Sequence, residues 1–190
     1  MNGQERTVDP WWSYTQGCAV ALSRGVEPPV VATHGPLLQP NEVTRLSAPA
    51  HYSRLLGGDG HFDRAGAPFF VNPLLMAGAM ATQGAVNRGR RRRAEQDAQP
   101  SWRDHQSVHL WSTTDRLIWD GGSGLSSLWY GDITGFYPEL DSWTLTLATS
   151  DGQAPVRLQG PAVPLVSLWT ATAVQGERWW QDPRLAALLR

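Results

Sequence analysis

A succession of short apolar segments between Val108 and Leu158, each followed by residues typical of turns, constrains the fold more than any other feature. Residues 143–147 alternate polar and apolar side chains and end near a Ser-Asp-Gly turn, and residues 117–119 end at Asp-Gly-Gly. Such alternation places the apolar side chains on one face of a strand. The pattern therefore predicts antiparallel hairpins rather than strands joined by helical crossovers.

A helix is predicted directly after these strands. Val166, Trp169 and Ala173 lie at helical spacing within residues 161–174, and Gly176 is a natural terminator. This segment is apolar enough to pack against the sheet.

Other helices are predicted outside this region. Residues 9–24 form the first, because Asp9 suits the N-cap and Pro10 suits the first helical position. Its expected apolar stripe consists of Trp11, Tyr14, Cys18 and Leu22. A second helix is expected over residues 73–95, and a short one after Asp182 at the C-terminus.

Two segments are predicted from their Gly and Pro residues. Residues 42–56 are ambiguous between short strands and a turn of helix, because Pro49 interrupts either pattern. The glycine-rich residues 121–124 lie between two strand-like segments, so a hairpin loop is expected there rather than a phosphate-binding loop.

Composition restricts the class of partner. The 190 residues carry a net charge of −1, so no nucleic-acid partner is expected. All 16 basic residues are arginine, which is typical of GC-rich coding DNA, as in an actinobacterium or one of its phages. The ten tryptophans are expected mainly in the core. Cys18, the single cysteine, excludes an internal disulfide and is expected to be inert packing.

The N-terminal residues lack the basic and then apolar layout of a secretory signal, so a cytoplasmic location is expected. Residues 69–86 are the strongest candidate for a membrane span. Asn72, Pro73 and Gln83 make this segment a poor spanning helix.

Two sequence motifs carry a family resemblance. Residues 113–118 read Thr-Thr-Asp-Arg-Leu-Ile, and residues 130–136 read Tyr-Gly-Asp-Ile-Thr-Gly-Phe. They resemble the bacterial pleckstrin-homology-like (PH-like) domain family, in which a Thr-x-x-Arg hairpin precedes a strand with an Asp-Ile-Thr step. The resemblance covers residues 107–175, including the helix that such folds place at one end of the barrel.

The resemblance implies an α+β fold with a strongly curved antiparallel sheet or partial barrel, a C-terminal capping helix and additional outer helices. Residues 1–40 would form an N-terminal helix and proline-rich connector. Residues 41–176 would form the PH-like domain, with a basic helical insertion at residues 73–98. Residues 177–190 would form the C-terminal short helix.

The residues of these motifs are expected to serve the structure. Thr113 and Asp115 suit hydrogen bonds to the local backbone of a turn. Arg116 is a candidate to pair with Asp132 on a neighbouring strand. Neither role implies catalysis.

These features favour a non-catalytic binding or scaffold module. It would dock a protein partner, or a second copy of itself, through a sheet edge, loops and Trp-rich surfaces. The candidate protein-binding anchors are Trp11, Trp12, Trp179 and Trp180, which are expected to be exposed.

An anionic membrane adaptor at the inner face of the membrane is the first alternative. Its candidate anion-binding residues are Arg88, Arg90, Arg91, Arg92 and Arg93. A solvated helix end explains the same cluster, since Glu95 and Asp97 follow at once.

An enzyme with a dispersed site is the second alternative, although no catalytic motif is present and no cofactor is expected. Asp59, His61 and Asp63 alternate as metal ligands on an extended segment would, but ordinary loop residues explain the pattern as well. No metal site and no catalytic residue are therefore predicted.

Overall fold

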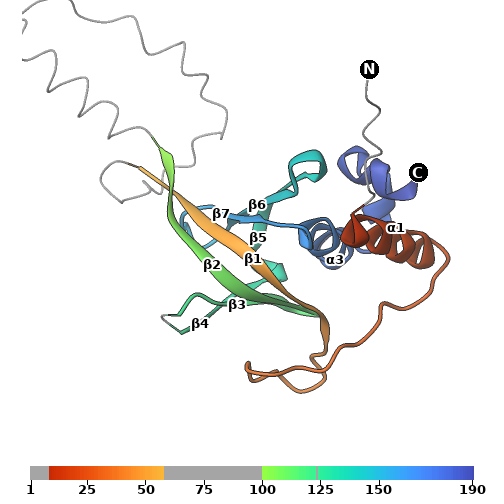
Figure 1. Ribbon diagram of the computed structural model, residues 1–190, viewed down its shortest axis with the longest axis horizontal. Coiled ribbons are helices and arrows are strands. Elements are labelled where there is room, and N and C mark those ends of the chain that lie inside the picture. Colours follow the sequence, from red (N-terminus) through yellow and green to blue (C-terminus); the bar gives the residue numbers. More distant parts are fainter. Residues whose placement is uncertain (1–8, 58–99, 123) are drawn as a thin grey trace, which may run out of the picture.

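One sheet of seven antiparallel strands dominates the computed structural model, which describes residues 9–57, 100–122 and 124–190. The strand order is β4-β3-β2-β1-β7-β6-β5, so β4 and β5 form the two edges. The sheet is curved but not closed (Figure 1). This confirms the predicted α+β class with a curved antiparallel sheet.

The elements follow the predicted hairpins closely. The strands are β1 (Thr44–Leu56), β2 (Ser101–Thr113), β3 (Arg116–Asp120), β4 (Leu125–Trp129), β5 (Ile133–Glu139), β6 (Thr144–Thr149) and β7 (Val156–Gln159). The helices of the described segments are α1 (Pro10–Ser23) and α3 (Val163–Gln175), with the 3-10 helices η2 (Tyr130–Asp132), η3 (Leu140–Ser142), η4 (Gly176–Gln181) and η5 (Pro183–Leu189).

Pro49 lies inside β1 and does not interrupt it, so the predicted break there is wrong. β1 pairs with β2 along its length, but it pairs with β7 only over residues 51–54. One side of β1 therefore has no ladder partner at Pro49, and proline is tolerated where its missing N–H faces no neighbouring strand.

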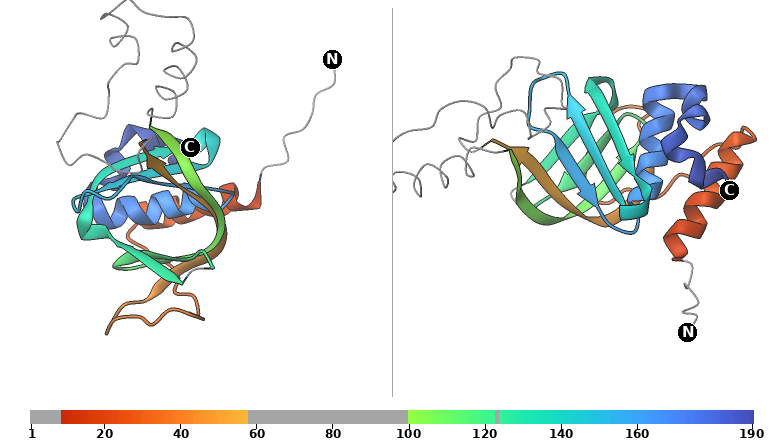
Figure 2. Two further views of the ribbon diagram at one scale, coloured as in Figure 1. Left: turned by 90° about the vertical axis from the view of Figure 1, so that its left-hand side faces the viewer. Right: turned by 90° about the horizontal axis from the view of Figure 1, so that it is seen from above.

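The core lies between the buried face of the sheet and α3. Along β1, every second residue from Thr44 to Tyr52 is buried. Nine residues of α3 are buried, because this helix contacts β1, β5 and β6 on one side and α1 on another. Figure 2 shows α3 and α1 together at one end of the sheet. The predicted helix after the last strand is thus confirmed.

The predicted N-terminal helix is also confirmed, but its buried face differs from the expected stripe. The Trp11 N–H donates to the Asp9 carboxylate at 2.8 Å, which identifies Asp9 as the N-cap. The fully buried residues of α1 are Thr15 and Ala19, while Tyr14 is 48% exposed. Small side chains face the core because α1 packs closely on α3, and the larger ones flank that contact.

The C-terminal segment belongs to the same core as the sheet. Leu185 and Leu188 of η5 are almost fully buried, and η5 contacts α1 and β5. The predicted cap is confirmed, since the Asp182 carboxylate accepts from the Arg184 N–H at 3.0 Å, although the element is a 3-10 helix. The helix predicted over residues 73–95 lies outside the described residues.

Asp182 gives an acid-sensitive contribution to stability. Hydrogen bonds from Arg184 lower the pKa of this carboxyl more than burial raises it. The pKa is therefore lowered from 3.8 to about 2. The ionised form is therefore stabilised by folding. Its contribution is complete above the ordinary pKa of an aspartate and is lost as the pH falls toward 2.

We expect D182N to lower the free energy of unfolding by about 1–2 kcal/mol at pH 7, a value reduced for the partial exposure of Arg184. Asparagine keeps an oxygen that can cap the Arg184 N–H, but the variant removes the charge and the oxygen that accepts from Gln175 and from the Arg184 guanidinium. Urea unfolding between pH 3 and 7 should show the difference from wild type shrinking as the pH falls. A difference that is constant across this range would contradict the assignment.

Candidate functional site

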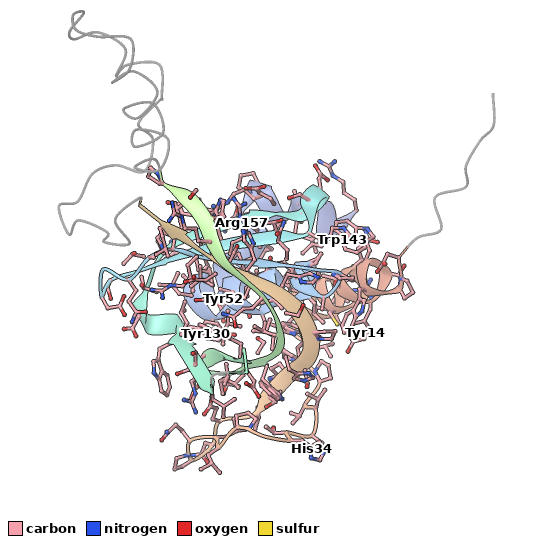
Figure 3. The ribbon with its side chains drawn as sticks, turned by 60° about the vertical axis from the view of Figure 1, so that its left-hand side comes forward. Tyr14, His34, Tyr52, Tyr130, Trp143 and Arg157 are labelled. Atoms are coloured by element: carbon pink, nitrogen blue, oxygen red, sulfur yellow. The ribbon has the colours of Figure 1, made fainter. Side chains whose placement is uncertain are left out.

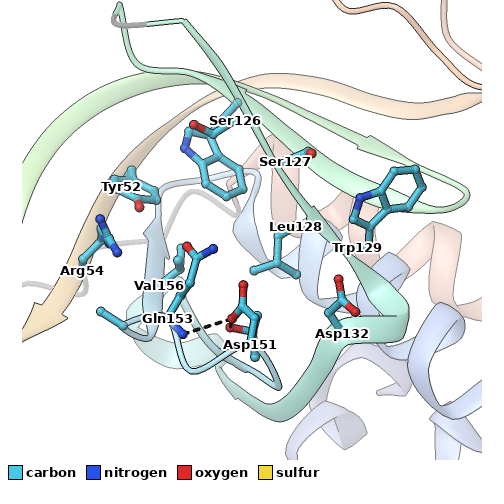
Figure 4. Close-up of a pocket in the computed structure, with 13 residues that line it drawn as sticks. Tyr52, Arg54, Ser126, Ser127, Leu128, Trp129, Asp132, Asp151, Gln153 and Val156 are labelled. Atoms are coloured by element: carbon cyan, nitrogen blue, oxygen red, sulfur yellow. Dashed lines mark hydrogen bonds between the residues drawn. The ribbon is translucent and has the colours of Figure 1, made fainter. Parts of the chain in front are cut away.

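A pocket of about 400 Å³ lies where β4, the end of β1 and the loop between β6 and β7 approach one another (Figure 4). Its lining residues are Tyr52, Arg54, Trp119, Ser126, Ser127, Leu128, Trp129, Asp132, Thr149, Asp151, Gln153, Ala154 and Val156. Three separate hairpins therefore contribute to one hollow beside an edge of the sheet.

The lining shows that this pocket reaches the free edge of β4. Four consecutive residues of the strand, 126–129, line it. Side chains alternate between the two faces of a strand, so a pocket on one face would be lined by every second residue. Residues of both faces of β4 line it together with Tyr52 of β1, so the pocket extends from the inner face of the curved sheet to the backbone edge of β4. That edge is free, because β4 ends the strand order.

The register identifies which backbone groups face this edge. The Tyr130 N–H donates to the Asp115 carbonyl at 3.0 Å, and the pairing of β3 with β4 continues from there without a shift. In an antiparallel ladder, every second pair exchanges both of its hydrogen bonds. Leu125, Ser127 and Trp129 therefore direct their N–H and C=O groups away from β3.

Tyr130 holds the corner between β4 and β5. Its side chain is 7% exposed, and its hydroxyl lies 2.8 Å from the Ser112 hydroxyl of β2 (Figure 3). Burial raises the pKa of this phenol, which stays protonated. The buried Tyr130 side chain thus fixes the point where the chain leaves β4 for β5.

Trp129 is held at the rim of the pocket by a pair of charged residues. The Arg116 guanidinium lies 4.6 Å from the centroid of the Trp129 ring and donates to both carboxylate oxygens of Glu42 at 3.0 Å. Burial alone would raise the pKa of Glu42, but the hydrogen bonds from Arg116, the Gln39 amide and Thr113 leave it lowered. Arg116 thus pairs with Glu42, and the expected pairing with Asp132 is wrong.

The turn chemistry predicted for Thr113 is confirmed, whereas Asp115 contributes its backbone N–H and not its carboxylate. The Thr113 hydroxyl accepts from the Asp115 and Arg116 N–H groups at 3.1 and 3.0 Å. It also donates to Glu42 at 2.7 Å. The turn between β2 and β3 therefore fixes the start of β3 and the position of Arg116.

Two carboxylates and an arginine line different parts of the pocket. Figure 4 shows Asp132 next to Trp129 and Asp151 in the middle of the pocket beside Gln153, whereas Arg54 lies at the far side beside Tyr52. Hydrogen bonds from the Thr149 hydroxyl and the Gln153 N–H hold the pKa of Asp151 below its ordinary value. Among the described residues, neither Asp132 nor Asp151 has an ion-pair partner within 4.0 Å.

The other edge of the sheet is occupied by the chain itself. Arg184 of η5 donates to the Phe136 carbonyl of β5 and lies 5.3 Å from the centroid of the Phe136 ring. Pro138 also removes one N–H from this strand. β4 is therefore the edge with accessible backbone next to a pocket.

The predicted tryptophan anchors lie in different environments. Trp179 is 4% exposed and belongs to the core, so the expectation that it is exposed is wrong. Trp180 is 52% exposed, and Trp11 and Trp12 are partly buried against the core. None of the four lines the β4 pocket. Their proposed contact with a partner stays a prediction.

Cys18 lines a different, apolar groove of about 450 Å³ between α1 and residues 26–29. Burial raises the pKa of its thiol, with a smaller opposing effect of a hydrogen bond from Tyr14. A raised pKa lowers the fraction of reactive thiolate at neutral pH.

The predicted anion-binding residues Arg88, Arg90, Arg91, Arg92 and Arg93 lie outside the described residues, as do Asp59, His61 and Asp63. Within the described segments, no group of three or more His, Cys, Asp or Glu side chains is arranged to hold a metal ion. None of the helices in these segments has both the length and the apolar character that a bilayer span requires.

Sequence reasoning missed the carboxylates of the pocket. The sequence motifs suggest Asp132 only as a partner of Arg116 and Asp151 only as a turn residue. The two are brought together because η2 and the β6–β7 loop lie at the same end of the sheet. No local sequence pattern predicts that Asp132 and Asp151 line the same pocket. The unpaired edge of β4 was the available signal, since a hairpin strand without a further partner leaves one edge open.

Comparison with known proteins gives no match: no protein-family model matches the chain, and no curated protein matches its sequence.

Proposed function

We propose that this protein is a non-catalytic binding module that takes up an extended segment of a protein partner along the free edge of β4. The observation that carries the proposal is the lining of the pocket by four consecutive β4 residues. Main-chain hydrogen bonds along such an edge supply affinity, and pockets for alternate side chains supply specificity.

The surroundings of this edge support the same reading. Leu125 is 52% exposed and Trp129 is 38% exposed, so apolar side chains flank the open backbone. Edge strands of monomeric proteins are usually protected by charge, proline or a covering element. Within β4 itself no residue is charged or proline, which favours an edge that is kept for a partner.

The curved sheet with a helix directly after its last strand also supports our proposal that the fold is PH-like, with α3 as the capping helix. A scaffold role fits such a module because the proposed binding edge lies at the rim of the sheet. The membrane-adaptor alternative rests on Arg88 to Arg93 and has no support from the described residues.

Two variants of one residue test the use of the backbone edge. S127P removes an N–H that faces the free edge, whereas S127A removes the hydroxyl and keeps the N–H. Peptides would first be selected from a displayed library of random dodecapeptides on the wild-type protein. We expect S127P to weaken the selected peptides at least tenfold and S127A to change their affinity less than twofold.

Circular dichroism would establish that both variants keep the wild-type fold, since proline is tolerated at an edge position whose N–H faces outward. Recovery of no binding peptide from the library would overturn the proposal. Equal affinity of a selected peptide for S127P and the wild type would overturn it as well.

A further inference from the structure

The chemistry of the β4 pocket indicates what kind of side chain enters it. The pocket combines apolar walls with two carboxylates. Tyr52 and Trp119 are both 7% exposed and stack with ring centroids 5.3 Å apart, and Leu128 and Val156 complete the apolar wall. An occupant can therefore pack an apolar stem against this wall.

Two carboxylates line the pocket away from Arg54, Asp132 beside Trp129 and Asp151 near its middle (Figure 4). Both residues are exposed. The Asp151 carboxylate is fixed in place by the Thr149 hydroxyl at 2.6 Å and the Gln153 N–H at 3.0 Å. A carboxylate held in this way is ionised and oriented before a ligand arrives, which reduces the ordering cost of binding.

We propose that the extended segment taken up by β4 places a lysine or arginine side chain in this pocket, with its aliphatic stem against the apolar wall and its cation at Asp132 and Asp151. The inference rests on the proposed function of β4 and names the side chain that the site selects. Lysine and arginine are the residues whose apolar stem ends in a positive charge.

Arg54 helps to determine where in the pocket a positively charged side chain can be placed. It lies on the opposite side of the pocket, beside Tyr52 (Figure 4). Its guanidinium repels a cation that approaches from that side, so a basic side chain is directed toward the two carboxylates. An acidic side chain would instead be attracted by Arg54 and repelled by the two carboxylates.

Trp129 adds a further contact for a cation near the rim. One face of its ring is already covered by Arg116, at 4.6 Å from the centroid. That arrangement fixes the orientation of the indole, which is 38% exposed. The stem of a lysine or arginine can pack on an indole held in this way.

Three synthetic peptides test the inference. They are acetylated, amidated heptapeptides of sequence Thr-Val-Thr-Xaa-Thr-Val-Thr, in which Xaa is lysine, norleucine or glutamate. Norleucine keeps the stem and lacks the charge. Affinities would be measured by amide chemical-shift titration of the labelled full chain, which also reports whether the β4 amides of Leu125, Ser127 and Trp129 move.

We expect the lysine peptide to bind about fivefold more tightly than the norleucine peptide, and the glutamate peptide to bind most weakly. D132N should bring the lysine peptide to within about twofold of the norleucine peptide, and raising the sodium chloride concentration should do the same. Among the described residues, the Asp132 carboxylate accepts no hydrogen bond and forms no ion pair, so D132N is expected to leave the fold intact. D141N, which removes an exposed carboxylate on η3 away from the pocket, is the matched control and should change neither affinity.

Two outcomes separate the two proposals. If β4 amides shift with every peptide and the lysine and norleucine peptides bind equally, the preference for a basic side chain is wrong and the β4 edge is retained. Tightest binding by the glutamate peptide would likewise reject the inference in favour of recognition by Arg54. If none of the peptides moves the β4 amides, and the displayed library also yields no binder, the proposed function itself is overturned.

Discussion

R116L is expected to lower the free energy of unfolding by about 3–5 kcal/mol, because it leaves the Glu42 carboxylate buried without its charged partner. Glu42 has no exposed side-chain surface, and Arg116 supplies two of its hydrogen bonds. For a chain of this size, each 1 kcal/mol lowers the melting temperature by about 2–4 °C. Differential scanning calorimetry at pH 7 would measure the effect.

Two further variants identify the cause of this loss. R178L replaces an exposed arginine and should change the free energy of unfolding by no more than about 0.5 kcal/mol. Adding E42Q to R116L removes the buried charge and should restore part of the stability. A double variant less stable than R116L alone would show that the uncompensated charge is not what destabilises the protein.

The pair Arg116 and Glu42 shows why much of the site was beyond sequence reasoning. The two residues are 74 positions apart and meet only because the segment before β1 passes beside the turn between β2 and β3. Local turn chemistry at Thr113 was predictable from neighbouring residues, since its hydrogen bonds span two or three positions. The partner of Arg116 depended on the tertiary fold.

The same distinction explains which elements of the fold were predictable. The strand segments at residues 117–119 and 143–147 and the helices α1 and α3 are encoded by local alternation, spacing and caps, and the structure places β3, β6 and both helices within a few residues of the predicted segments. Pro49 misled because its effect depends on whether a strand lies beside its missing N–H, which only the pairing of β1 with β7 decides. Burial along α1 depended likewise on the close approach of α3.

The adjacent tryptophans of η4 provide the second large effect. W179A is expected to lower the free energy of unfolding by about 3–5 kcal/mol, since it empties a buried site in the core. W180A should cost no more than about 1 kcal/mol, because roughly half of that side chain is already in solvent, at 52% exposure. Guanidinium unfolding at 25 °C, followed by circular dichroism, would measure both.

Trp179 and Trp180 are expected to differ in role, with Trp179 serving the core and Trp180 serving contact with a partner. Trp180 stays a candidate anchor for a partner or a second copy, so W180A should lower association measured by analytical ultracentrifugation or capture while leaving stability nearly intact. W179A should act on association only through the fraction of unfolded protein. Equal destabilisation by the two variants would contradict the burial of Trp179 and exposure of Trp180 on which this division rests, because two side chains in such different environments cannot contribute equally to the core.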